Sequence, residues 1–189
     1  MNTNGDVIFG SGVIFDNSEI LCTNAHLVTY KKSGIYHKFE KFEVRFAFEE
    51  EYHQSSLFKY DIEQDIAFLE ILDAKSLNLA SIHLEKNKEL KTGSEVYAIG
   101  NAMNQGLSIT KGTVSLARVN IQYDGFIRKM IQCDLTINDG DSGGVLLNAF
   151  GNMVGMPSFR LKRNGETIQG IAYCIPVNKI LDCYEKTNA

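Results

Sequence analysis

The chain has 189 residues, of which 44% are hydrophobic and 22% are charged, and its formal net charge is −4. This size suits one compact domain, or two small barrels that share a core, and excludes a large second domain. Interspersed acidic and basic residues argue against a nucleic-acid surface, and we expect no membrane insertion because no apolar run approaches 18 residues. The polar N-terminus does not resemble a signal peptide.

Short segments with alternating apolar and polar residues follow one another along the chain. In one of them Phe42, Val44, Phe46 and Phe48 share a face, which is typical of a half-buried strand. Many such strands separated by Gly, Asn and Asp turns indicate an all-β fold, either barrels or a sandwich. The expected strands cover residues 7–15, 19–23, 42–48, 66–72, 95–99, 108–119, 126–133, 145–147, 152–156 and 168–175.

The chain is expected to form a single domain, residues 1–189, built from two halves. Polarity rises and strand alternation lapses at about 79–93, so we expect an N-terminal barrel at about 1–78 and a C-terminal barrel with a helix at about 94–189. Only the stretch 177–184 has apolar residues at helical spacing, and it follows a proline, so it is the expected C-terminal helix.

The run Asn138 to Gly144 reads NDGDSGG and contains one serine among small residues. Glycines allow a tight turn that exposes the Ser142 hydroxyl and directs the backbone N–H groups of Gly140 and Ser142 toward one point. A serine hydroxyl is a poor nucleophile until a base takes its proton and a carboxylate orients that base. The motif therefore predicts a nucleophile that needs two partners.

Both partners are found upstream, each beside an apolar run. His26 follows the strand-like run that begins at Ile20, and Asp65 immediately precedes the run Ile66 to Ile71. His37, His53 and His83 lack such a setting and are interpreted as surface or packing residues. Asp61 lies four residues before Asp65 but does not adjoin the apolar run, and Ser11 between two glycines is interpreted as structural.

At this point the chain resembles the trypsin-like (chymotrypsin-fold) serine peptidases, and most closely their HtrA/DegP-like branch. The resemblance rests on the segments TNAHLV, DIAFLEI, IGNAMNQGLSITKGTVS, GDSGGVLLNAFGNMVGM and GIAYCIPVNKI, in that order. It implies two perpendicular six-stranded Greek-key β-barrels with a short C-terminal helix. It also implies a serine endopeptidase that cleaves protein or peptide substrates through an acyl-enzyme, without cofactor or metal. His26, Asp65 and Ser142 would be catalytic, and Gly140 and Ser142 would form the oxyanion hole.

The same resemblance implies a substrate pocket that carries no charge. It predicts cleavage after small or medium uncharged residues, because a neutral pocket cannot pair with a buried Lys or Arg. Pro157 at the pocket edge has no N–H to donate to a substrate backbone. Thr136 would lie at the base of the pocket, Gly155, Met156 and Pro157 along one wall, and Gly170 with Ala172 on another.

The cysteines do not match the disulfide positions of the secreted enzymes of this family, so free thiols are expected, which favours a cytoplasmic location. No activating N-terminal cleavage site is recognised. The sequence therefore leaves open whether the chain forms a homo-oligomer or binds a regulatory partner. It also leaves open whether the fold serves for binding or autoprocessing, with little activity in trans. The four cysteines are Cys22, Cys133, Cys174 and Cys183.

Overall fold

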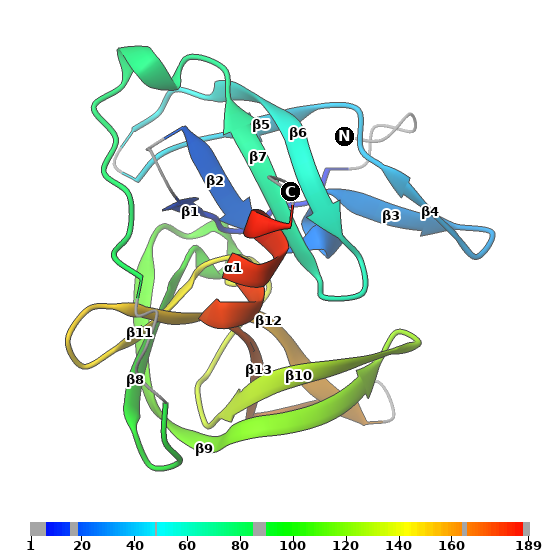
Figure 1. Ribbon diagram of the computed structural model, residues 1–189, viewed down its shortest axis with the longest axis vertical. Coiled ribbons are helices and arrows are strands. Elements are labelled where there is room, and N and C mark those ends of the chain that lie inside the picture. Colours follow the sequence, from blue (N-terminus) through cyan, green and yellow to red (C-terminus); the bar gives the residue numbers. More distant parts are fainter. Residues whose placement is uncertain (1–6, 16–18, 48, 85–89, 164–165, 187–189) are drawn as a thin grey trace.

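The computed structural model describes residues 7–15, 19–47, 49–84, 90–163 and 166–186. The fold is mostly β and has two halves, one above the other in Figure 1, with the helix α1 (Val177–Glu185) between them. Tyr184 of α1 packs on Phe15 and Phe68 of the N-terminal half, with ring centroids 5.1 and 5.2 Å apart. The predicted C-terminal helix is confirmed, and it joins the two halves.

The N-terminal half is a five-stranded antiparallel sheet in the order β1-β2-β7-β6-β5. The described residues thus supply five of the six strands expected for this half, and β1 and β5 each pair with one strand among them. A separate hairpin, β3 with β4, follows β2. The strands are β1 (Val13–Phe15), β2 (Ile20–Thr23), β3 (Thr29–Lys32), β4 (Ile35–Lys38), β5 (Phe42–Val44), β6 (His53–Asp61) and β7 (Ile66–Ile71).

The C-terminal half is a closed barrel in the order β10-β13-β12-β11-β8-β9, which confirms the predicted six strands here. Closure leaves no strand of this barrel with an unpaired edge. The strands are β8 (Glu95–Gly100), β9 (Ser108–Tyr123), β10 (Phe126–Cys133), β11 (Val145–Asn148), β12 (Met153–Arg163) and β13 (Glu166–Pro176).

One apolar core cluster spans the two halves. Phe15 and Phe68 from the upper sheet belong to the same buried cluster as Met156 of β12 and Ile180 of α1. A second cluster fills the closed barrel, and a third lies under the open sheet around Leu21. Burial of large apolar side chains is the main stabilising contribution in such a fold, so this shared cluster fixes how the halves meet.

Most expected strands are present, with shifted ends. The expected strand 7–15 begins only at Val13, and the expected strand 42–48 ends at Val44, with Phe48 outside the described residues. The hairpin β3–β4 and the strand β6 were not predicted. β6 carries mainly polar residues, and its place comes from pairing with β5 on one side and β7 on the other.

Candidate active site

His26 lies in a short 3-10 turn, η1 (Ala25–Leu27), directly after β2. Its backbone N–H donates to Asp65 Oδ1 at 3.0 Å, and its Nδ1 lies 3.0 Å from each carboxylate oxygen of Asp65. The side chain is 46% exposed. A carboxylate on Nδ1 selects the tautomer with its proton there, which leaves Nε2 as an acceptor.

Asp65 lies at the start of β7 in a backbone conformation unusual for a residue with a side chain, with φ of +59°. The Asn24 side chain donates to the Asp65 carbonyl at 3.0 Å and holds this turn in place. Burial by itself raises the pKa of Asp65. The charge of His26 and the hydrogen bonds from His26 and Ser158 outweigh burial and hold the pKa below its ordinary value. Asp65 is therefore ionised at neutral pH.

Ser158 of β12 is a site residue that the sequence analysis missed. Its Oγ donates to Asp65 Oδ2 at 2.6 Å, and its side chain is 2% exposed. The bond joins residues 93 positions apart, one from each half of the molecule. No local pattern marks it, because it is one serine within a strand whose neighbours are apolar.

Ser142 lies in the turn before β11. Its Oγ donates to the Ser158 carbonyl at 2.9 Å, and no hydrogen bond joins it to His26 in the described structure. Both residues nevertheless line one cavity of about 600 Å³ between the halves, together with Asp65 and Ser158. The structure thus brings the three predicted catalytic residues into one cleft, with the hydroxyl directed at a carbonyl.

The loop that contains Gly140 is fixed by contacts from two other segments. Ser11 N–H donates to the Ser142 carbonyl at 2.8 Å, and Ser11 Oγ donates to the Gly140 carbonyl at 2.6 Å. Met103 N–H donates to the Asp139 carbonyl at 2.7 Å. Since the C=O and N–H of a trans peptide point in opposite directions, this bond directs the Gly140 N–H away from Met103. Ser11, interpreted as structural, thus supports the candidate oxyanion loop.

Asp141, next to Ser142, is buried without a cationic partner in contact. Its carboxylate accepts the Asn138 N–H at 2.7 Å, and burial raises its pKa above the ordinary value. Gly100 lies against it, because a Cβ there would come within 2.6 Å of Asp141 Oδ1. A backbone amide thus takes the place of a charged partner for this acid.

The six residues predicted for the substrate pocket do not line this cavity. Met156 and Ala172 are fully buried in the core, Gly155 and Pro157 are also buried, and Thr136 and Gly170 are exposed. On β12 the lining residues are Ser158, Phe159 and Arg160, directly after Pro157. The residues of β12 that face the cleft are therefore shifted along the strand from the predicted wall.

Aromatic and paired charged groups surround the rest of the cavity. Phe159 stacks on Tyr123 with ring centroids 4.0 Å apart, and Arg160 forms an ion pair with Asp139 at 2.7 Å. Arg128 is buried and donates to the carbonyls of Ile62 and Glu63 at 2.9 and 2.7 Å, which links the barrel to the upper sheet. Arg160 is thus paired with an acid, and the Arg128 guanidinium is hydrogen-bonded to backbone carbonyls.

Among the described residues no group of His, Cys, Asp and Glu could hold a metal ion. No helix of the described segments has the length and apolar character needed to cross a membrane. All four cysteines are free and buried, which confirms the expected thiols, and burial raises the pKa of Cys22 above its ordinary value.

Comparison with known proteins agrees with this fold. The trypsin-like peptidase domain family matches residues 10–156, and the chain belongs to that family. Within it the chain is similar to the HtrA, DegP and DegS proteases. It is 32% identical over 173 residues to a probable periplasmic serine endoprotease DegP-like of Pseudomonas putida strain F1, covering 92% of this chain and 33% of the relative.

Two further relatives extend the comparison. The serine endoprotease DegS of Haemophilus influenzae is 31% identical over 181 residues, covering 94% of this chain and 49% of DegS. The solved structure of the HtrA-type protease AlgW with decapeptide aligns with a TM-score of 0.77 at 30% identity, covering 94% of this chain and 51% of that one. The chain therefore spans between a third and about half of the length of these relatives.

Proposed function

We propose that this chain is a serine endopeptidase in which His26, Asp65 and Ser142 act together. One observation carries the proposal: the Asp65 carboxylate accepts from His26 and from Ser158, and this assembly shares a cavity with Ser142. Asp65 stays ionised because its pKa is lowered, so it stabilises the imidazolium that forms when His26 takes a proton.

The reaction begins when Ser142 Oγ leaves the Ser158 carbonyl and turns toward His26 Nε2. His26 accepts the hydroxyl proton while Oγ bonds to the carbonyl carbon of the substrate peptide, and the oxyanion is stabilised by the N–H groups of Gly140 and Ser142. Collapse breaks the C–N bond, and His26 donates its proton to the leaving amine. Water, activated by the same imidazole, then hydrolyses the acyl-enzyme.

The substrate class follows from the charges around the cleft. Asp139 and Arg160 pair with each other, and Arg128 is occupied by backbone carbonyls. A charged substrate side chain buried against this wall would find no unpaired group of opposite charge among the residues that line the cavity, and burying an unpaired charge is costly. We therefore propose cleavage after small or medium uncharged residues, next to the aromatic wall of Phe159 and Tyr123.

A serine-reactive fluorophosphonate probe tests the proposal. The wild-type chain should become labelled, and mass spectrometry should place the adduct on Ser142. Ser142→Ala should abolish the label, whereas Ser81→Ala at an exposed serine should keep it. A folded wild-type chain that takes up no label under any condition would contradict the proposal.

A second candidate, a binding or autoprocessing module with little activity in trans, is favoured by one observation. Ser142 Oγ donates to the Ser158 carbonyl and not to His26. Cleavage of a mixed peptide library, measured over a range of protein concentrations, separates the two. A labelled chain that cleaves no added peptide would favour the module, and concentration-dependent cleavage would favour a protease that is activated on association.

A further inference from the structure

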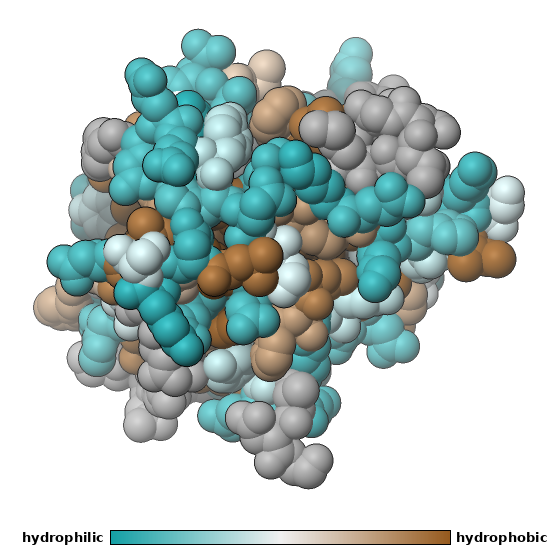
Figure 2. All heavy atoms as spheres, turned by 90° about the horizontal axis from the view of Figure 1, so that it is seen from above, coloured by the Kyte–Doolittle hydropathy of each residue, from teal (hydrophilic) through white to brown (hydrophobic). Residues whose placement is uncertain are grey.

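Arg128 of β10 is the only lysine or arginine that is buried in the part of the chain that the structure describes, with 4% of its surface exposed. Charged side chains usually stay in water, and seen from above, hydrophilic residues cover much of the N-terminal half (Figure 2). Burying a charge is costly unless the group is hydrogen-bonded, so a guanidinium in the wall of the active-site cavity needs an explanation. The steps of the proposed reaction do not involve Arg128.

The Arg128 guanidinium binds backbone carbonyls from both halves of the molecule. Its Nε donates to the Glu63 carbonyl at 2.7 Å and its Nη2 to the Ile62 carbonyl at 2.9 Å, both in the turn between β6 and β7. Its Nη1 donates to the Tyr123 carbonyl at 3.3 Å, at the end of β9. The three acceptors are all backbone carbonyls, which suit the fixed fork of donors in a guanidinium.

The turn that Arg128 binds carries the candidate acid. The Ile62 carbonyl also accepts the Asp65 N–H at 3.3 Å, so one carbonyl connects Arg128 to Asp65. Asp65 has φ of +59°, and a residue in this left-handed region keeps its conformation only when surrounding contacts fix it. Asn24 fixes the Asp65 carbonyl from within the N-terminal half, and Arg128 fixes the preceding peptides from the other half.

A second series of contacts joins the same two places along the cavity wall. Ser158 of β12 donates to the Asp65 carboxylate. Phe159, the next residue on β12, stacks on Tyr123, whose ring lies 5.8 Å from the Arg128 guanidinium. The barrel therefore supports the acid in two ways, through Ser158 at its side chain and through Arg128 at its backbone.

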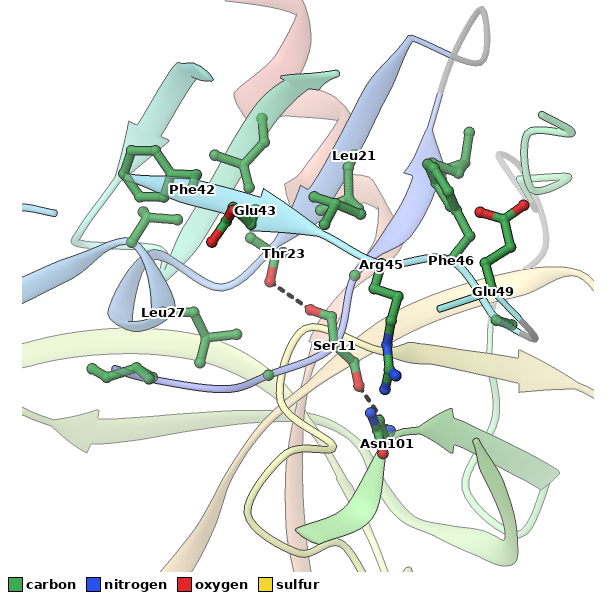
Figure 3. A pocket seen from close by; sticks show the side chains of 18 of the residues that line it. Ser11, Leu21, Thr23, Leu27, Phe42, Glu43, Arg45, Phe46, Glu49 and Asn101 are labelled. Atoms are coloured by element: carbon green, nitrogen blue, oxygen red, sulfur yellow. Dashed lines mark hydrogen bonds between the residues drawn. The ribbon is translucent and has the colours of Figure 1, made fainter. Parts of the chain in front are cut away.

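This support has a counterpart in the opposite direction. Ser11 of the N-terminal half lines a second cavity, of about 740 Å³, and its hydroxyl donates to the Gly140 carbonyl of the barrel. Figure 3 shows the Ser11 side chain directed at Asn101, whose N–H it accepts at 2.8 Å. Each half thus holds the segment of the other half that carries a candidate catalytic group.

We propose that Arg128 is a positioning residue that holds the Asp65 carboxylate against His26 from across the cleft. The guanidinium fixes the two peptides that lead into the Asp65 turn, and the carboxylate then stays 3.0 Å from His26 Nδ1. Without Arg128 both carbonyls lose a donor, and the turn can leave the left-handed conformation that aims the carboxylate. The inference rests on the proposed function, since a misplaced carboxylate lowers activity only if Asp65 acts on His26.

Kinetics of Arg128→Ala test this role in the intact chain. We expect kcat for a fluorogenic peptide to fall by about 10²-fold while KM changes little, because a misplaced carboxylate affects the reacting state and not substrate binding. Guanidinium chloride, at concentrations too low to unfold the protein, should occupy the vacated site and restore part of the lost kcat, whereas equal NaCl should not. Lys129→Ala is the matched control, because it removes a positive charge from the exposed face of the same strand, and it should change neither value.

An NMR readout in the inactive Ser142→Ala chain separates this inference from the proposed function. The His26 Nδ1–H bound to Asp65 should give a low-field proton resonance that is lost in Arg128→Ala and returns with guanidinium. If circular dichroism shows that Arg128→Ala is unfolded, Arg128→Lys replaces it, since lysine keeps the charge without the fork and should also lose the resonance.

The possible outcomes distinguish the two proposals. A resonance missing from the Ser142→Ala chain itself would overturn both, because His26 and Asp65 would not be paired. A resonance that persists in a folded Arg128 variant would overturn the positioning role alone. A raised KM with unchanged kcat in Arg128→Ala would also overturn it, because Arg128 would then bind substrate directly.

Discussion

The upper sheet and the lower barrel follow the same strand order, yet among the described residues only the lower one closes. The open half carries His26 after β2 and Asp65 before β7, and the closed half carries Ser142 before β11 and Ser158 on β12. The candidate acid and base are therefore held by a five-stranded sheet, while the nucleophile lies on a closed barrel. Polar contacts between the halves, such as Ser158 to Asp65, compensate for this difference at the site itself.

The largest expected effect comes from the carboxylate that joins the halves. Asp65→Asn keeps the shape but removes the negative charge that holds His26 and accepts from Ser158. We expect kcat for a fluorogenic peptide to fall by about 10⁴-fold, as in related triads. Asp61→Asn is the matched control, because Asp61 accepts the Gln64 N–H at the turn before β7. A larger loss of kcat in Asp61→Asn than in Asp65→Asn would assign the role of the triad carboxylate to Asp61.

The second-largest effect on kcat is expected from Gly140, which lies in the turn before β11 on the closed half. Gly140 has φ of +100°, and a Cβ there would come within 2.3 Å of the Asn101 carbonyl oxygen. Gly140→Ala must shift the loop and its N–H, so kcat should fall by about 10²–10³-fold. Gly151→Ala is the control, since its φ is +79° but a Cβ would meet nothing within 4 Å. Equal losses would indicate backbone strain alone, without a role for the Gly140 N–H.

The sequence predicts the site residues that lie in local patterns, but not those that depend on contacts between distant segments. His26 and Asp65 each adjoin an apolar run, and Ser142 lies in a turn of small residues. Such patterns can be recognised within a single segment of the sequence. Ser158 acts through a partner 93 positions away, and no local pattern contains that pairing. The strand β6 and the shifted wall at Phe159 likewise depend on neighbouring strands. Whether a sheet closes depends on which strands pair with its outer strands, which alternation within a segment does not reveal.

A smaller effect is expected at the contact by which the open half supports the oxyanion loop. Ser11→Ala removes the donor to the Gly140 carbonyl and the acceptor of the Asn101 N–H. Each such bond contributes about 0.5–1.5 kcal/mol, so kcat should fall by about tenfold while KM stays nearly constant. Ser81→Ala should change neither value. A raised KM with unchanged kcat would mean that Ser11 supports substrate binding and not the loop.

The smallest effect concerns the stability of the open half and its dependence on pH. His53 at the start of β6 is buried, and its Nδ1 lies 2.8 Å from Asp73 Oδ2. The hydrogen bond to Asp73 raises the pKa of His53 above its ordinary value, although burial lowers it. A raised folded pKa means that the stabilisation is complete below the unfolded pKa of about 6.5 and is lost as pH rises through the folded value.

Asp73→Asn should therefore lower the Tm at pH 5.5 and have less effect at pH 9, as measured by circular dichroism. Asp73 is half exposed, so the pair is worth only about 0.2–1 kcal/mol after screening by solvent. Asp182→Asn on α1, which removes an exposed pair with Lys179, should change the Tm equally at both pH values. His53 pairs with Val44 in the β5–β6 register, so its ion pair with Asp73 lies beside the edge strand of the sheet. A pH-independent loss in Asp73→Asn would show that the carboxylate acts by packing and not by charge.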